Sequence, residues 1–158
     1  MPRLPEIFNR EELPEDKRWV HDYLIKTRGK ISNGYAPYLH RPDYVARISQ
    51  LGTYIRFESS LPQDAYELLA LTASAECDNP YEADNHALLT AKMGIPRPTV
   101  DAARNKTEIT GASESHELYI RCAREMIREH KLSDASFEAV RKRLGENGVI
   151  DLIGTIGY

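Results

Sequence analysis

Hydrophobic residues recur every three or four positions along most of this chain, which is the spacing of amphipathic helices. No stretch alternates strictly between apolar and polar residues, as a half-buried strand would. The pattern predicts an all-α protein, a compact single-domain bundle of six to eight helices. The predicted helices cover residues 15–31, 42–57, 62–77, 81–93, 100–105 and 114–131, with a short one around 137–144 and an apolar line over 149–156.

Two helix starts are marked by local signals. Asn79 is a good N-cap, Pro80 suits the first helical position, and Glu82 follows three residues after the cap. Upstream, Ser60 is predicted to cap the helix over 62–77. The chain therefore predicts two consecutive helices joined by a short turn.

These two helices carry the most informative titratable residues. Glu67 interrupts a helix that is otherwise apolar almost all round, so its charged form is disfavoured there unless it is paired. Glu82 and His86 are four residues apart on one face, which continues to Met93 and is expected to be buried. The hypothesis is that Glu67, Glu82 and His86 converge on one cavity. The competing interpretations are an ordinary surface pair for Glu82 and His86, and a structural partner such as arginine for Glu67.

The composition of the chain excludes some classes of partner but does not indicate a function. The chain has 158 residues and a net charge of −3, so it has no strongly basic surface to favour nucleic acid. We expect a proline- and charge-rich arm over 1–14 and one domain over 15–158. The start does not resemble a signal peptide and no apolar run is long enough to span a membrane, so we expect a cytoplasmic protein.

Cysteine and histidine spacing gives no metal site and no redox motif. Cys77 and Cys122 lie far apart in sequence, which fits a reducing compartment. Taken alone, Cys77 is expected to be a small buried residue. Glu82 and His86 would need a third ligand from elsewhere, and the remaining histidines have no partner at metal-ligand spacing. We therefore predict no metal and no cofactor.

The chain resembles the carboxymuconolactone decarboxylase family, within the alkylhydroperoxidase (AhpD)-like superfamily. The resemblance is carried by an apolar helix with Glu67, then Asn79-Pro80-Tyr81-Glu82, His86 four residues on, and residues 91–95. It extends over nearly the whole chain, through residues 18–34, 40–42, 51–58, 132–135 and 151–158.

The resemblance implies more about fold than about reaction. The peroxidase branch carries a Cys-x-x-Cys pair before the histidine, and Asn79 and Glu82 stand where those cysteines would be. A disulfide-cycling peroxidase without its thiolate and resolving thiol has lost its chemistry. Cys77 lies two residues too early. The resemblance to the decarboxylase family implies instead an acid–base lyase or decarboxylase acting on a small carboxylated or lactone-type metabolite, and this is the activity we expect.

In that interpretation His86 carries the proton, because its unperturbed pKa is near neutrality, and Glu82 or Glu67 orients it. Two alternatives stay open: a thiol-dependent hydroperoxidase using Cys77, and a non-catalytic oligomeric binding protein. The candidate catalytic residues are Glu67, Glu82 and His86. The candidate binding residues are Tyr81, Cys77, Tyr35, Tyr38 and Tyr119.

The resemblance also implies self-association, as a homodimer, homotrimer or homohexamer. The apolar ending over 149–156 must be buried against its own core or a partner subunit. The expected partners are a small-molecule substrate and further copies of the chain, with no nucleic acid and no membrane.

Overall fold

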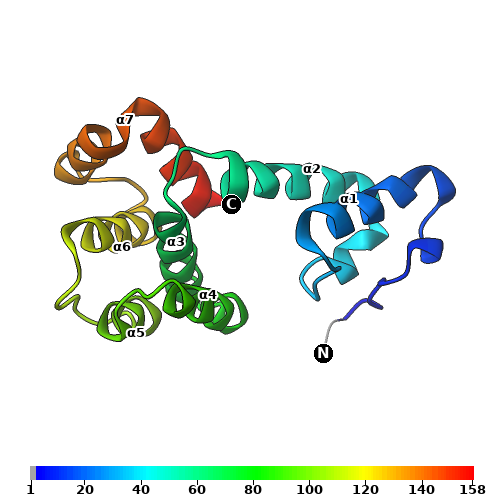
Figure 1. The fold of residues 1–158 in the computed structure, drawn as a ribbon, viewed down its shortest axis with the longest axis horizontal. Helices are drawn as coiled ribbons and strands as arrows, with labels where there is room; N and C mark the ends of the chain where they lie inside the picture. The colour runs from blue at the N-terminus through cyan, green and yellow to red at the C-terminus, as the bar shows by residue number, and fades with distance from the viewer. Residues whose placement is uncertain (1–2) are drawn as a thin grey trace. The chain divides into compact units, whose positions relative to one another are not determined.

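The computed structural model describes residues 3–158, and within them it contains seven α-helices and no strand (Figure 1). The all-α prediction is confirmed. Shorter turns of 3-10 helix lie at Arg10–Glu12, Glu15–Lys17 and Ala36–His40, and a π-helical turn covers Tyr54–Glu58. The α-helices are α1 (Arg18–Arg28), α2 (Pro42–Thr53), α3 (Gln63–Glu76), α4 (Pro80–Lys92), α5 (Arg97–Asn105), α6 (Glu114–Arg128) and α7 (Asp134–Gly157).

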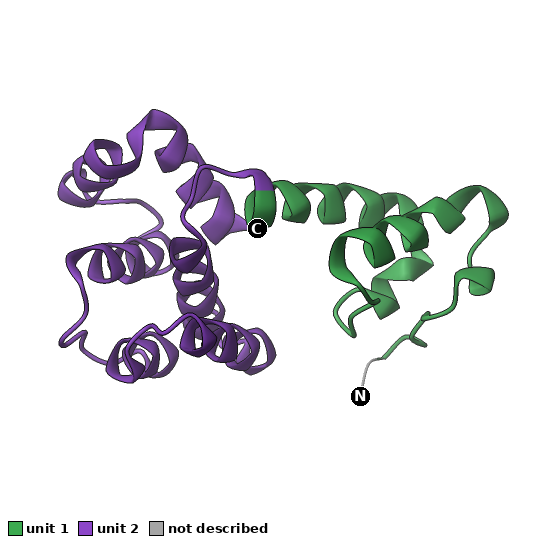
Figure 2. Ribbon diagram, viewed as in Figure 1, with its two compact units in different colours: residues 1–57 green, residues 58–158 purple. Residues whose placement is uncertain are grey.

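The chain divides into two compact units, residues 1–57 and residues 58–158 (Figure 2). Each unit has a hydrophobic core of its own. In the first unit α1 and α2 pack together, and the core takes residues from both helices and from the segment before them. Its buried residues are Ile7, Leu13, Val20, Leu24, Leu39, Val45 and Ala46.

The described part of the predicted arm is attached to the first unit by one backbone–backbone and one side-chain–backbone hydrogen bond. Ile7 N donates to Ala36 O at 3.1 Å, and His40 Nε2 donates to Pro5 O at 2.9 Å. Ile7 and Leu13 are buried, so the arm contributes two side chains to this core. The domain boundary predicted at residue 14 stays a prediction.

In the second unit, α3 is the central helix and contacts each of α4, α5, α6 and α7 (Figure 1). Leu68, Leu69 and Leu71 are fully buried along it. Because a helix enclosed on most sides is apolar around its circumference, the predicted interior position is confirmed. Any polar side chain that α3 turns inward therefore lies in an apolar environment.

The start of α3 differs from the prediction. The N-cap residue is Pro62, and Ser60 lies outside the helix. Ser60 instead donates from its backbone N and from Oγ to Oδ2 of Asp151 in α7, at 2.7 and 2.6 Å. A partner 91 residues away thus satisfies Ser60 in place of the local cap.

The start of α4 agrees with the prediction, since Oδ1 of Asn79 accepts from the backbone N of Glu82 at 3.2 Å. Toward the C-terminal end of α4, however, the helix face that was predicted to be buried is not. Met93, which follows the helix, is 43% exposed, and only the part of the face around His86 is buried.

Helix α7 is bent at Gly145, where the backbone has φ 72° and ψ −177°. Only glycine adopts this conformation readily. The bend separates the predicted helix around 137–144 from the apolar line after it. Val149, Leu152 and Ile156 are buried in the second unit, so this segment covers its own core.

Candidate active site

A tight turn between α3 and α4 brings the candidate residues together. Cys77 ends α3, and Asp78 adopts a left-handed conformation with φ 55° before Asn79 caps α4. Aspartate tolerates this conformation better than most residues because its short side chain bonds locally. The two helices pack side by side, and Glu67 of α3 faces His86 of α4.

Glu67 and His86 form a buried carboxylate–imidazole pair. Oε2 of Glu67 lies 2.6 Å from Nδ1 of His86, a distance typical of charge-assisted hydrogen bonds. Glu67 is 1% exposed and His86 is 8% exposed. Because a carboxylate only accepts, Nδ1 carries the hydrogen, and in the neutral imidazole the lone pair is on Nε2. The pair therefore orients His86 and leaves Nε2 as the ring nitrogen that can accept a proton.

Glu82 lies on the other side of the imidazole. Its Oε2 is 3.9 Å from Nε2 of His86, which is too long for a direct hydrogen bond and within range of an ion pair. The Glu82 side chain is 39% exposed, so it connects the buried pair with solvent. The three predicted catalytic residues are thus brought together in the order Glu67, His86, Glu82.

Two further residues of α3 contact this group, and neither was predicted from the sequence. Nε2 of Gln63 donates to Oε1 of Glu67 at 3.3 Å. The ring of Tyr66 meets the His86 ring edge to face, with centroids 5.9 Å apart and an interplanar angle of 76°. The spacing of four residues between Gln63 and Glu67 was the only signal in the sequence that could have identified the first of them.

The comparisons with known proteins identify the fold. No family model matches the chain, and no curated protein matches it. Among solved structures, it is similar to the crystal structure of an alkylhydroperoxidase AhpD core, an uncharacterized peroxidase-related protein from Ralstonia eutropha JMP134. The TM-score is 0.74 at 19% sequence identity, over 99% of this chain and 85% of the other. The chain has the AhpD-like fold. At this identity the similarity establishes the fold, and the chemistry has to be argued from the site.

The predicted binding residues of this AhpD-like chain lie in different surroundings. Tyr81 of α4 is 58% exposed, and Cys77 is an exposed free thiol rather than the buried residue expected. Tyr119 of α6 is buried, and burial raises the pKa of its phenol, while a hydrogen bond with Arg143 opposes the rise.

Tyr35 and Tyr38 belong to the first unit of the AhpD-like chain. The ring of Tyr35 lies 5.1 Å below the Arg28 guanidinium, and Tyr38 packs edge to face with Tyr44 at 6.0 Å. Each tyrosine thus has a packing role within its own unit. Their part in a binding site stays a prediction.

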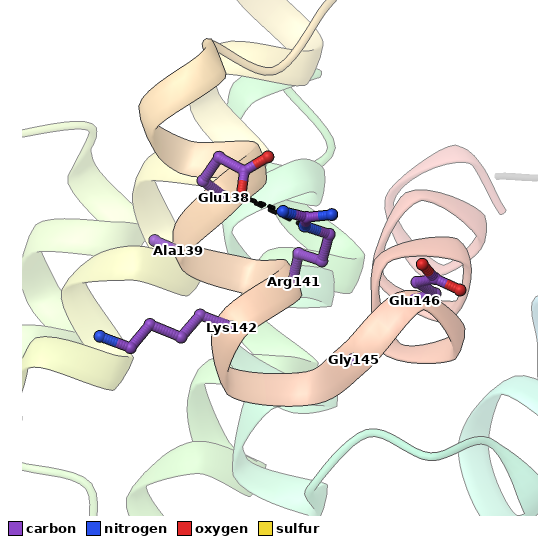
Figure 3. A pocket seen from close by; sticks show the side chains of 6 residues that line it. All are labelled: Glu138, Ala139, Arg141, Lys142, Gly145 and Glu146. Atoms are coloured by element: carbon purple, nitrogen blue, oxygen red, sulfur yellow. Dashed lines mark hydrogen bonds and ion pairs between the residues drawn. The ribbon is translucent and has the colours of Figure 1, made fainter.

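Two cavities in the described part of the chain lie away from the Glu67–His86 pair. One, of about 660 Å³, opens at the bend of α7 beside Gly145, and an ion pair of 2.7 Å between Glu138 and Arg141 lies on one of its walls (Figure 3). The other, of about 280 Å³, lies along α6 between Ile109 and Arg124. Neither is lined by a predicted site residue. The convergence of the three residues is thus observed, and a cavity beside them stays a prediction.

Residues 3–158 contain neither a metal-binding cluster nor a membrane-spanning helix. Within this range, no three His, Cys, Asp or Glu side chains are grouped so that they could hold a metal ion. Over the same residues, no helix combines the length and apolar character needed to cross a membrane.

Proposed function

We propose that this protein is a cofactor-independent acid–base enzyme, a lyase or decarboxylase that acts on a small carboxylated or lactone-type metabolite. The observation that carries the proposal is the 2.6 Å hydrogen bond between buried Glu67 and Nδ1 of His86, with Nε2 directed to the solvent-connected Glu82. A histidine held by a second group at one nitrogen is the usual arrangement of a general acid or base.

The chemistry follows from that orientation. In a decarboxylation the bond to the carboxylate breaks, carbon dioxide leaves, and the electron pair stays on the substrate as an enolate. Protonated His86 then transfers its Nε2 proton to the carbon, and the negative charge of Glu67 stabilises the imidazolium before transfer. Glu82, at 3.9 Å and partly exposed, returns a proton from solvent to Nε2. The same residues suit proton transfer in lactone opening or isomerisation.

The test is turnover by a His86→Asn variant. We expect a panel of small β-keto acids and carboxylated lactones, followed by carbon dioxide release and by absorbance, to show a rate loss of about 10²–10⁴-fold. His130→Asn is the matched control, because His130 is exposed and its φ of 59° suits asparagine. Unchanged turnover in His86→Asn would remove His86 from the mechanism. If the wild-type protein turns over no member of the panel, the proposed substrate class is wrong and the non-catalytic binding protein is favoured.

A thiol-dependent hydroperoxidase is the second candidate, favoured by the exposed Cys77 and by the description of the structural neighbour as peroxidase-related. Its thiolate would attack the peroxide oxygen, releasing an alcohol and leaving a sulfenic acid that an external thiol must reduce. Cys122 does not suit the resolving role, because burial raises the pKa of its thiol to about 12. Hydroperoxide consumption with dithiothreitol that disappears in Cys77→Ser would support this candidate, and consumption that persists would exclude it.

We further propose that the protein is a cytoplasmic homo-oligomer. Along α2 and the turn after it, Tyr44, Leu51, Tyr54 and Phe57 are 44–57% exposed, which is a large amount of apolar surface for one short segment. A second copy of the chain is the occupant that the family resemblance implies. Analytical ultracentrifugation should give a mass at least twice 18.0 kDa at micromolar concentration, and a stable monomer would contradict it.

A further inference from the structure

We propose that Gln63 is a positioning residue for the Glu67–His86 pair, and that its side-chain amide fixes which carboxylate oxygen of Glu67 is presented to the imidazole. This inference rests on the proposed function, in which the orientation of His86 matters. Gln63 is the first residue of α3, four positions and about one helical turn before Glu67, and its amide bonds the carboxylate oxygen that the histidine does not use.

The two carboxylate oxygens of Glu67 have different hydrogen-bond partners. Oε2 accepts from Nδ1 of His86 at 2.6 Å, and Oε1 accepts from Nε2 of Gln63 at 3.3 Å. The terminal torsion of a glutamate has broad, roughly two-fold preferences, so the side chain itself does little to hold the plane of its carboxylate. A donor at each oxygen supplies that restraint. With Oε1 anchored, Oε2 stays directed at the imidazole.

Because Gln63 is exposed, its effect on the orientation of His86 can be tested without a large change in the stability of the protein. Gln63 is exposed at the start of a helix, whereas Glu67, which it contacts, is buried in the interior of the second unit. An exposed substitution at a helix terminus ordinarily changes stability very little. Gln63 can therefore be replaced without disturbing the core, and a change at His86 would report on the hydrogen bond alone.

The Tyr66 ring limits what else could restrain the histidine. It contacts the imidazole edge to face, so it restricts the ring plane but offers no hydrogen bond along the Nδ1 direction through that contact. The direction of the Nδ1 hydrogen bond is set by the carboxylate. The orientation of the carboxylate is in turn what Gln63 influences.

The experiment is nuclear magnetic resonance on the intact protein with ¹⁵N-labelled histidine, which needs no substrate. The probe is the Nδ1 proton of His86 and its exchange with solvent. In Gln63→Leu, which keeps the size and removes the donor, we expect exchange to be about three- to tenfold faster, the effect of losing one ordinary hydrogen bond. Gln63→Lys, which retains a nitrogen donor, should restore most of the protection. The matched control is Gln50→Leu, at an exposed position of α2, which should leave the signal unchanged.

The outcomes separate this inference from the proposed function. A protected Nδ1 proton in the wild type that is equally protected in Gln63→Leu would overturn the role of Gln63 and leave the pair intact. Absence of a protected Nδ1 proton in the wild type would overturn both, because there would be no oriented pair to position. A thermal midpoint in Gln63→Leu equal to that of the wild type, together with faster exchange, would support positioning over a structural role.

Discussion

Replacing His86 by leucine tests whether the Glu67 carboxylate is stable in the interior because His86 is hydrogen-bonded to it. Glu67 is 1% exposed and its Oε2 is 2.6 Å from the imidazole, so the substitution removes a hydrogen bond donor from an acid that water cannot reach freely. Leucine fills a similar volume, so a cavity contributes little. The measured cost then reflects the unpaired carboxylate.

The expected magnitude follows from the burial of the pair. Breaking a buried ion pair by removing one partner ordinarily costs about 3–5 kcal/mol, because the remaining charge must stay desolvated or take up a proton. We expect His86→Leu to lower the free energy of unfolding by that amount at pH 7, and the thermal midpoint by about 10 °C. The double variant Glu67→Leu/His86→Leu should recover much of the loss, since replacing both members by apolar residues is often neutral or stabilising.

The assay is urea unfolding of the wild type, both single variants and the double variant, followed by helical circular dichroism at constant protein concentration. Glu138→Leu is the control, because the Glu138 side chain is 57% exposed and its pair with Arg141 should contribute little. A loss of less than about 1 kcal/mol in His86→Leu, or a double variant as unstable as the sum of the singles, would refute the reasoning. Either result would mean that Glu67 does not depend on His86 to remain buried.

Three other predictions rest on separate features. At pH 8 iodoacetamide should label Cys77 in the native protein and Cys122 only after unfolding. The reason is that Cys77 is exposed, whereas burial raises the pKa of the Cys122 thiol to about 12. Mass spectrometry that finds both cysteines labelled in the native protein would contradict this prediction. Burial alone would raise the pKa of the Glu125 carboxyl, yet hydrogen bonds from Ser133 and Ser136 hold that pKa below its usual value. Glu125→Gln should therefore be less stable than the wild type at pH 7, and in matched urea titrations the difference should shrink as the pH falls and vanish below the lowered pKa of Glu125. Gly145→Ala should destabilise the protein by about 1–3 kcal/mol, since φ is 72° and ψ is −177° there, and an unchanged urea midpoint would show that the bend relaxes without cost.

The helices could be predicted because the signals for them are local. Apolar spacing predicted a helix over at least part of each α-helix in residues 3–158, although the second half of α7 was predicted only as an apolar line, and Asn79 marked the start of α4 correctly. Ser60 was assigned wrongly as a cap because its actual partner, Asp151, is 91 residues away and becomes adjacent only when α7 folds back over the second unit. The bend at Gly145 was not predicted for a different, local reason, since one glycine in a helical pattern does not reveal its φ.

The site was predictable to the extent that it depends on helical register. Glu67 stood out as a charge in the middle of a largely apolar helix, and Glu82 and His86 lay on one face, so their meeting followed from two packed helices. The expected burial of Met93 was wrong, because the helix face is covered only as far as its neighbours extend. Gln63 was missed because a polar residue at a helix start has an ordinary explanation, and only the direction of its side chain shows what it contacts.

Asn79 and Glu82 stand at the two positions where the resemblance places the cysteines of a dithiol site. Asn79 accepts a hydrogen bond from the backbone N of Glu82, a capping role that a cysteine fills poorly, so Asn79 strengthens the start of α4. Glu82 lies 3.9 Å from Nε2 of His86. Since Glu67 occupies the opposite nitrogen at 2.6 Å, the imidazole lies between two carboxylates, an arrangement suited to holding and transferring a proton. A thiolate needs the opposite surroundings, because nearby negative charge disfavours it. These surroundings therefore support the proposed acid–base chemistry, in which His86 transfers the proton.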